Sequence, residues 1–264
     1  MSDETLLDRY DALLIDLDGT VYRGGQAVPG AAEAVAEART KGAGIRFVTN
    51  NASRSPQSVA AHLNELGFET AEDEVSTSAQ AGAAMVAERV PPGTKVLVLG
   101  TSALVAEIAA RGLEPVTTAD AEAVVQGLSQ DLGWRELAEA CVAIRNGALW
   151  VACNVDRTLP TERGLLPGNG AMVAALKAAT DAEPLVAGKP ATPLLEQAAK
   201  SLGAHRPLVV GDRLDTDIAG AVNAGMDSLL VLTGVSTRAE ADALPEEWRP
   251  TYVGADLSVL HGLP

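Results

Sequence analysis

Four apolar runs of strand length, each followed directly by a polar cluster, constrain the fold of this chain more than any other feature. The clusters are DLDGT at 16–20, TNN at 49–51, GKP at 188–190 and GD at 211–212. Because the runs alternate with stretches of helical periodicity, they predict parallel strands joined by right-handed helical crossovers. In open sheets of this kind, ligands bind beyond the carboxyl ends of the strands. The pattern therefore predicts a doubly wound α/β core with a functional site at one edge of its sheet.

A second series of strands and helices interrupts this core. Pro91-Pro92-Gly93 marks a candidate boundary. Three further apolar runs follow it, at 96–100, 123–128 and 148–153. Segment 154–170 is predicted to be a loop that leads into a helix ending near Thr180.

We therefore predict a core in two sequence pieces, residues 1–81 and 185–264, and a smaller inserted α/β domain, residues 82–184. A length of 264 residues suits this division, and a hydrophobic content of 47% is enough to bury a sizeable core.

The acidity of the chain limits its partners. A net charge of -15 disfavours nucleic acid and anionic membranes, since affinity for both comes largely from Lys and Arg. The same acidity has a plainer interpretation, which is solubility. A phosphorylated substrate would need local positive charge, and a divalent cation with one lysine could supply it.

The sequence also predicts a cytoplasmic protein. Cys141 and Cys153 are too few for a disulfide framework and are typical of a reducing compartment. The first residues are acidic and carry no apolar run of signal-peptide length. No uncharged apolar stretch reaches the roughly 18 residues that a membrane span requires.

Asp16 and Asp18 carry the clearest chemistry. Residues two apart in a strand point to the same side, so these two carboxylates would lie close together. Their repulsion favours a bound Mg²⁺. Asp16 could then act as a nucleophile, while Asp18 protonates the leaving alcohol and later deprotonates water. A solvated Asp-Gly turn is the alternative.

The second and third clusters suggest a phosphate site. The hydroxyl, amide and backbone N–H groups of Thr49, Asn50 and Asn51 could hold phosphate oxygens, although the same residues also suit a turn or a helix cap. Lys189 lies between Gly188 and Pro190 and could place its charge on the phosphate and on the nucleophile. A surface lysine is the alternative.

The fourth cluster, GDRLDTDIAG, contains three acids. Asp212 follows the strand directly and is the best candidate for a direct Mg²⁺ ligand. Asp217 could act on the metal through water or orient Lys189. Asp215 could simply stabilise the start of the helix.

Taken in order, these clusters resemble the four motifs of the haloacid dehalogenase superfamily, and the resemblance spans nearly the whole chain. DLDGTVYRG, TNNASRS, LPGNGAMVAAL, VAGKP and GDRLDTDI are similar to its class IIA branch, the nitrophenyl-phosphatase-like enzymes. Within that branch the similarity is closest to the glycerol-3-phosphate phosphatases of actinobacteria. The resemblance implies a Rossmann-like core and an α/β cap between the second and third motifs.

The resemblance also implies a role for each motif residue. Asp16 would be the nucleophile and a Mg²⁺ ligand, and Asp18 the general acid and base, with its backbone carbonyl on the metal. Thr49, Asn50 and Lys189 would bind the phosphoryl group, and Asp212 would complete the metal site. The implied enzyme is a Mg²⁺-dependent phosphatase acting on a small phosphorylated metabolite.

In this arrangement the core supplies the chemistry and the cap selects the substrate. The loop from Asn154 to Pro160 is the candidate for recognising the substrate. Asn154 and Asp156 could bond the hydroxyls of a polyol phosphate, and Arg157 could meet a second anionic group. A turn that only stabilises the cap is the alternative.

Several functions stay open at this stage. Glycerol 3-phosphate is the expected substrate, with 2-phosphoglycolate, pyridoxal phosphate and sugar or nucleotide monophosphates as alternatives. A phosphomutase would share the aspartyl-phosphate. A metabolite-binding protein without catalysis is a third possibility, and a homodimer is compatible with each of them.

Overall fold

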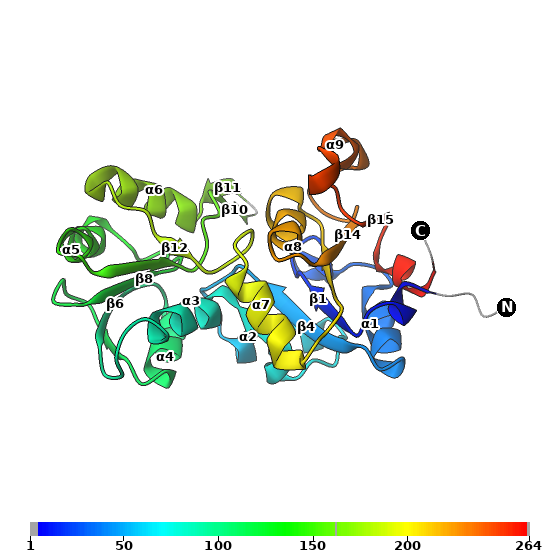
Figure 1. The fold of residues 1–264 in the computed structure, drawn as a ribbon, viewed down its shortest axis with the longest axis horizontal. Helices are drawn as coiled ribbons and strands as arrows, with labels where there is room; N and C mark the ends of the chain where they lie inside the picture. Colours follow the sequence, from blue (N-terminus) through cyan, green and yellow to red (C-terminus); the bar gives the residue numbers. More distant parts are fainter. Residues whose placement is uncertain (1–4, 162, 263–264) are drawn as a thin grey trace. The chain divides into compact units, whose positions relative to one another are not determined.

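The computed structural model describes residues 5–161 and 163–262 (Figure 1). The chain divides into two compact units. The core unit comprises residues 1–49, 56–76 and 189–264, and the inserted unit comprises residues 50–55 and 77–188. Each is described here by itself.

Six strands form the main sheet of the core unit, in the order β15-β14-β13-β1-β4-β5. Their bounds are β1 (Ala12–Ile15), β4 (Gly44–Thr49), β5 (Val75–Thr77), β13 (Pro207–Gly211), β14 (Asp227–Val231) and β15 (Tyr252–Gly254). The central strand β1 pairs in parallel with β13 and β4, so that Ile15 lies beside Val210 on one side and Phe47 on the other. Because these strands run in the same direction, the residues that follow them emerge at the same edge of the sheet.

Helices cover both faces of this sheet. Their bounds are α1 (Ala31–Thr40), α2 (Pro56–Glu65), α7 (Pro193–Leu202), α8 (Ala219–Asn223) and α9 (Arg238–Ala243). One apolar cluster joins α1 and α2 to alternate residues of the strands, among them Leu13 and Ile15. On α7, Pro193 stands at the first helical position and Gly203 adopts the left-handed conformation just after the end. The expected doubly wound α/β fold is confirmed.

The core unit also contains a short antiparallel hairpin that the sequence did not predict. Its strands, β2 (Tyr22–Arg23) and β3 (Gln26–Ala27), follow directly after the DLDGT cluster. Each strand has two residues, too few for an alternating pattern to stand out. The hairpin brings Tyr22 back beside Asp18.

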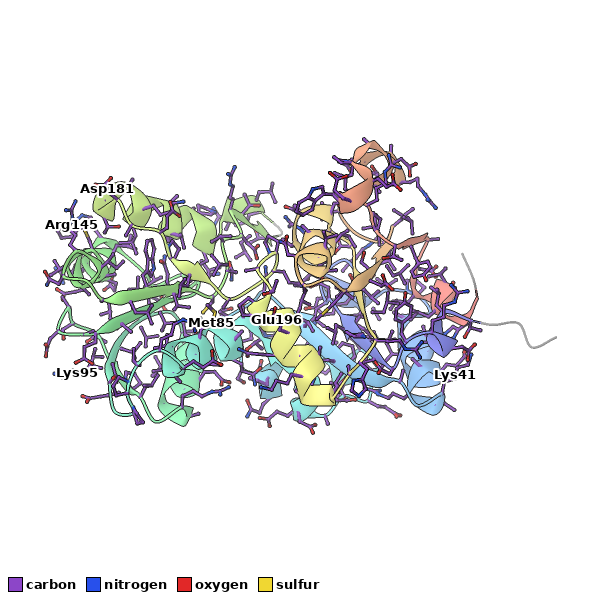
Figure 2. The ribbon with its side chains drawn as sticks, viewed as in Figure 1. Lys41, Met85, Lys95, Arg145, Asp181 and Glu196 are labelled. Atoms are coloured by element: carbon purple, nitrogen blue, oxygen red, sulfur yellow. The ribbon has the colours of Figure 1, made fainter. Side chains whose placement is uncertain are left out.

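Five strands form the sheet of the inserted unit, in the order β12-β9-β8-β6-β7. They are β6 (Lys95–Leu99), β7 (Glu114–Val116), β8 (Ala123–Gln126), β9 (Leu149–Ala152) and β12 (Leu185–Val186). The helices are α3 (Ser78–Ala87), α4 (Ser102–Ala110), α5 (Trp134–Arg145) and α6 (Asn169–Thr180). Within this unit, α5 and α6 lie on one face of the sheet and α3 and α4 on the other (Figure 1). Arg145 and Asp181 are close together at neighbouring ends of α5 and α6, where Arg145 donates two hydrogen bonds to the Ala179 carbonyl (Figure 2).

Segment 154–170, predicted as a loop, contains a hairpin instead. β10 (Thr158–Thr161) pairs with β11 (Gly164–Pro167) in antiparallel register. The segment lacks alternation of apolar and polar residues and carries Pro160, which hides a strand from pattern analysis. Gly164, the first residue of β11, has a φ of +103°.

The predicted boundary at residue 82 falls inside α3, which belongs wholly to the inserted unit. A capping box starts this helix: Thr77 Oγ1 accepts from Gln80 N, and Gln80 Oε1 accepts from Thr77 N. Among the helices that the structure describes, none is long and apolar enough to cross a membrane.

Candidate active site

Three acids of the core unit meet at the carboxyl edge of its sheet. Asp16 directly follows β1, and its N–H donates to the Val210 carbonyl at 2.8 Å, which continues the strand pairing by one residue. Asp212 directly follows β13, and Asp217 lies in a π-helical turn, Leu214–Ile218, that leads into α8. One carboxylate oxygen from each of the three lies within 4.8 Å of the others. π-Helical turns such as Leu214–Ile218 are frequent at functional sites.

Lys189 lies among these acids and is only 2% exposed. Its Nζ donates to Asp16 Oδ1 at 2.6 Å, to Asp217 Oδ1 at 2.7 Å and to the Val48 carbonyl at 3.2 Å. An ammonium has three protons, so these contacts use all of them. Burial alone would lower the pKa of Lys189, but the charges of Asp16 and Asp217 raise the pKa above its ordinary value. The lysine is therefore a fixed positive charge beside the nucleophile candidate.

Asp212 has the chemistry of a metal ligand. Its Oδ2 accepts from Val235 N at 2.7 Å, while its buried Oδ1 has no hydrogen-bond partner among residues 5–161 and 163–262. Burial, and then the charge of Asp217, raise the pKa of Asp212 to about 6. Burial and Asp217 likewise raise the pKa of Asp16, against the opposing charge of Lys189. Buried carboxylates that repel one another favour a bound cation, and oxygen ligands suit Mg²⁺. The residues present therefore fit this metal.

Glycines make room for the acid cluster. A Cβ on Gly19 would lie 2.5 Å from Asp212 Oδ2, and one on Gly234 would overlap the same carboxylate. Gly211 is pressed against Asp217 in the same way. Gly19 also has a φ of +85°, a conformation that side chains disfavour.

Both oxygens of Asp217 have protein partners. Oδ1 accepts from Lys189, and Oδ2 accepts from Arg213 N at 3.1 Å. Asp215, in contrast, is directed to Arg213, whose guanidinium bonds both of its oxygens at 3.0 and 2.8 Å. That hydrogen bonding lowers the pKa of Asp215.

Asp18 is exposed at the turn after β1, where its Oδ2 accepts from the Tyr22 hydroxyl at 3.3 Å. Thr49 is the last residue of β4 and is buried. Two residues without a predicted role contact this turn. Tyr22 belongs to the hairpin, and Thr233 follows β14 and donates to the Gly19 carbonyl at 2.6 Å. Tyr22 lies within the stretch DLDGTVYRG but beyond its polar cluster, and Thr233 lies in none of the motifs, so neither received a role from the sequence.

The inserted unit contains the remaining predicted residues. Asn50 Nδ2 lies 3.3 Å from each carboxylate oxygen of Asp156, and Asn154 Nδ2 donates to the Asn50 carbonyl at 2.7 Å. Asn51 Oδ1 instead caps its own turn by accepting from the N–H and the hydroxyl of Ser53. Arg157 is exposed. Asn50, which was predicted to bind phosphate, is thus hydrogen-bonded to the loop that was predicted to recognise the substrate.

Comparison with known proteins gives consistent results. The family model described as haloacid dehalogenase-like hydrolase matches residues 13–114, and the one described as HAD-hydrolase-like matches residues 186–260. The D-glycerol 3-phosphate phosphatase of Mycobacterium tuberculosis is 54% identical over 260 residues, which cover 98% of this chain and 73% of the relative. The acid sugar phosphatase of Staphylococcus saprophyticus is 37% identical over 96% of this chain and 97% of its own length.

A solved structure agrees with the sequence relatives. The crystal structure of the Mycobacterium tuberculosis glycerol phosphate phosphatase in complex with magnesium matches with a TM-score of 0.94 at 54% identity, covering 98% of this chain and 78% of that one. The predicted family and the predicted enzyme class, a phosphoric monoester hydrolase, are confirmed. The chain belongs to the haloacid dehalogenase-like hydrolases.

Proposed function

We propose that this chain is a Mg²⁺-dependent phosphatase that hydrolyses small phosphate monoesters, with glycerol 3-phosphate as its main substrate, through an aspartyl-phosphate on Asp16. The observation that carries the proposal is the buried Lys189, which contacts Asp16 and Asp217. Asp212 belongs to the same acid cluster, and its Oδ1 has no hydrogen-bond partner within the part of the chain that the structure describes. This arrangement provides a nucleophile, a fixed positive charge and a cation site at one sheet edge.

In the proposed site, the carboxylates of Asp16 and Asp212 and the backbone carbonyl of Asp18 would hold the metal. The bound cation supplies positive charge that offsets the charge of the phosphoryl oxygens. Asp217 holds Lys189 in place. Asp217 is itself held by Arg213 N, which supports a positioning role over direct metal contact.

Phosphoryl binding is proposed for Thr49, Asn50, Asn51 and Lys189. The Thr49 hydroxyl and the amides that follow it are neutral donors, and Lys189 is the charged one. Within the core unit, Thr49 and Lys189 would fix the phosphorus in line with an Asp16 oxygen. Phosphoryl transfer depends mainly on such positioning and on charge stabilisation.

Asp16 then attacks phosphorus, and the bond from phosphorus to the ester oxygen breaks. Asp18 gives its proton to that oxygen, so the product leaves as a neutral alcohol. In the second half, the Asp18 carboxylate takes a proton from water while the water oxygen attacks phosphorus. The bond between phosphorus and Asp16 breaks, inorganic phosphate leaves, and both carboxyl groups return to their starting forms.

The substrate proposal rests on the relatives. The 54% identity to a D-glycerol 3-phosphate phosphatase supports glycerol 3-phosphate, and the acid sugar phosphatase supports sugar phosphates as the second candidate. Substrate selection is proposed for the inserted unit through Asn154 and Arg157, whereas Asp156 is proposed to act through Asn50, whose Nδ2 lies 3.3 Å from each of its carboxylate oxygens. A cytoplasmic location, a homodimer and the absence of nucleic acid partners belong to the same proposal. The net charge of -15 supports the absence of nucleic acid partners, and the two free cysteines support the cytoplasmic location.

Phosphate release from a panel of phosphorylated metabolites, with and without Mg²⁺, tests the function. We expect turnover only with Mg²⁺, the highest kcat/KM on glycerol 3-phosphate and no turnover by folded Asp16→Asn. Activity in that variant would rule out the aspartyl-phosphate. An isomerised phosphate ester in place of free phosphate would indicate a mutase, and no reaction with any ester would indicate a binding protein.

A further inference from the structure

We propose that Tyr22 and Thr233 are positioning residues that hold the Asp18–Gly19 turn so that Asp18 can protonate the leaving alcohol. The inference rests on the proposed function, because it assigns a task to groups around its general acid. Both residues lie in the core unit. Tyr22 lies in the stretch DLDGTVYRG, where no role was assigned to it, and Thr233 lies in none of the motifs.

Thr233 holds the turn from the loop after β14. The side chain is 8% exposed, and its hydroxyl donates to the Gly19 carbonyl at 2.6 Å across 214 residues of sequence. The next two residues act on Asp212: Gly234 packs against its carboxylate, and Val235 N donates to it. The loop after β14 therefore contacts the turn that carries the acid and the carboxylate of the cation site.

Tyr22 holds the same turn from the hairpin. Its hydroxyl donates to Asp18 Oδ2 at 3.3 Å, and its carbonyl accepts from Gly19 N at 2.8 Å. The ring is fixed by an edge-to-face contact with His62, with centroids 5.2 Å apart and planes at 77°. Tyr22 is only 7% exposed, so its ring is packed in the protein while its hydroxyl contacts the exposed Asp18.

These contacts matter because Asp18 is an exposed side chain on a turn. Such a carboxyl samples several rotamers unless its backbone and one of its oxygens are held. Thr233 holds the backbone at Gly19, and Tyr22 holds a carboxylate oxygen. A small misplacement of a catalytic group costs rate out of proportion to the distance.

The leaving group separates positioning of the acid from general support of the site. A nitrophenolate is a stable anion and departs without a proton, whereas the alkoxide of glycerol must be protonated as it leaves. Loss of acid positioning should therefore reduce kcat/KM for glycerol 3-phosphate far more than for nitrophenyl phosphate. A purely structural defect would reduce both alike.

The experiment measures kcat/KM on both substrates for Tyr22→Phe, Thr233→Val and Thr233→Ser. We expect the ratio of glycerol 3-phosphate to nitrophenyl phosphate activity to fall about tenfold in the first two, which is part of the roughly 100- to 10,000-fold that general acid catalysis contributes. Thr233→Ser keeps a hydroxyl and should keep the ratio near that of the wild type. All rates are measured at saturating Mg²⁺, because the same turn carries the Asp18 carbonyl that is proposed to hold the metal.

Tyr10→Phe is the matched control. Tyr10 precedes β1, at the opposite edge of the sheet, and its hydroxyl donates to Asp227 at 2.7 Å. This variant loses a buried phenol hydrogen bond without contact to Asp18, so its ratio should not change. Equal losses on both substrates in Tyr22→Phe and Thr233→Val, or unchanged ratios, would overturn the inference. If one variant fails to fold, the other decides. Wild-type activity together with an inactive Asp16→Asn would leave the proposed function standing in either case.

Discussion

The ammonium of Lys189 lies 2.7 Å from the carboxylate of Asp217, and both side chains are almost fully buried. Asp217 thus offsets part of the cost of burying a charge. The same ammonium also donates a hydrogen bond to Asp16. The pair shows why a lysine can be held at a site that must also accept a phosphate.

Asp217→Asn removes the charge that holds Lys189 while keeping the size of the side chain. Breaking a buried ion pair costs about 3–5 kcal/mol, and the remaining contact with Asp16 favours the lower end, about 3 kcal/mol. We expect a lower urea midpoint and a lower kcat. Asp215→Asn is the control, because Asp215 pairs with Arg213 at the surface. A similar loss in both variants would contradict the special role of Asp217.

Mg²⁺ should stabilise the fold through Asp212. A ligand at 100 times its Kd stabilises the folded state by about 2.7 kcal/mol, which is measured as a rise in Tm. In Asp212→Asn most of that rise should be lost. Without metal the variant should unfold at no lower temperature than the wild type, because it removes a buried carboxyl whose pKa is raised to about 6. An undiminished Mg²⁺ effect would exclude Asp212 as a ligand.

Asp156 should act on every substrate through Asn50. Both of its carboxylate oxygens lie 3.3 Å from Asn50 Nδ2, so Asp156→Ala releases a residue proposed to bind phosphate. We expect KM to rise several-fold for glycerol 3-phosphate and nitrophenyl phosphate alike, as a lost charged hydrogen bond of about 1.5 kcal/mol would cause. This differs from the hypothesis that Asp156 reads substrate hydroxyls. A loss confined to glycerol 3-phosphate would restore that hypothesis.

Cys153 should resist thiol reagents in the folded protein. Burial raises the pKa of its thiol to about 12, so at pH 8 only about one molecule in ten thousand carries the reactive thiolate. Raising the pH toward 12 increases that fraction. Mass spectrometry after brief iodoacetamide treatment at pH 8 should find the label on the partly exposed Cys141 only. Urea should expose Cys153, and labelling of Cys153 without urea would contradict the packing.

Much of the core could be predicted because its signals are local. An apolar run such as 12–15 followed by Asp16 predicts both a buried strand and a polar residue at its end. Ser55-Pro56 and Thr192-Pro193 likewise announce the starts of α2 and α7.

The remaining features depend on contacts that no local pattern encodes. Asn50 and Asp156 are 106 residues apart, and Thr233 and Gly19 are 214 apart. The pair Thr233-Gly234 after a strand is typical of an ordinary turn. Its contact with the Asp18–Gly19 turn therefore becomes evident only in the folded chain. The β10–β11 hairpin was not predicted for another reason, which is that Pro160 weakens the sequence pattern of a strand.

Covalent trapping of phosphate on Asp16 tests the central claim most directly. The enzyme would be mixed with excess substrate and Mg²⁺, quenched in acid and reduced with borohydride, which converts an aspartyl-phosphate to homoserine. Trypsin then releases residues 10–23 as one peptide, and fragmentation distinguishes Asp16 from Asp11 and Asp18. The account predicts homoserine at position 16 alone, and none in Asp16→Asn. Homoserine at another position, or an unmodified peptide during steady turnover, would contradict it.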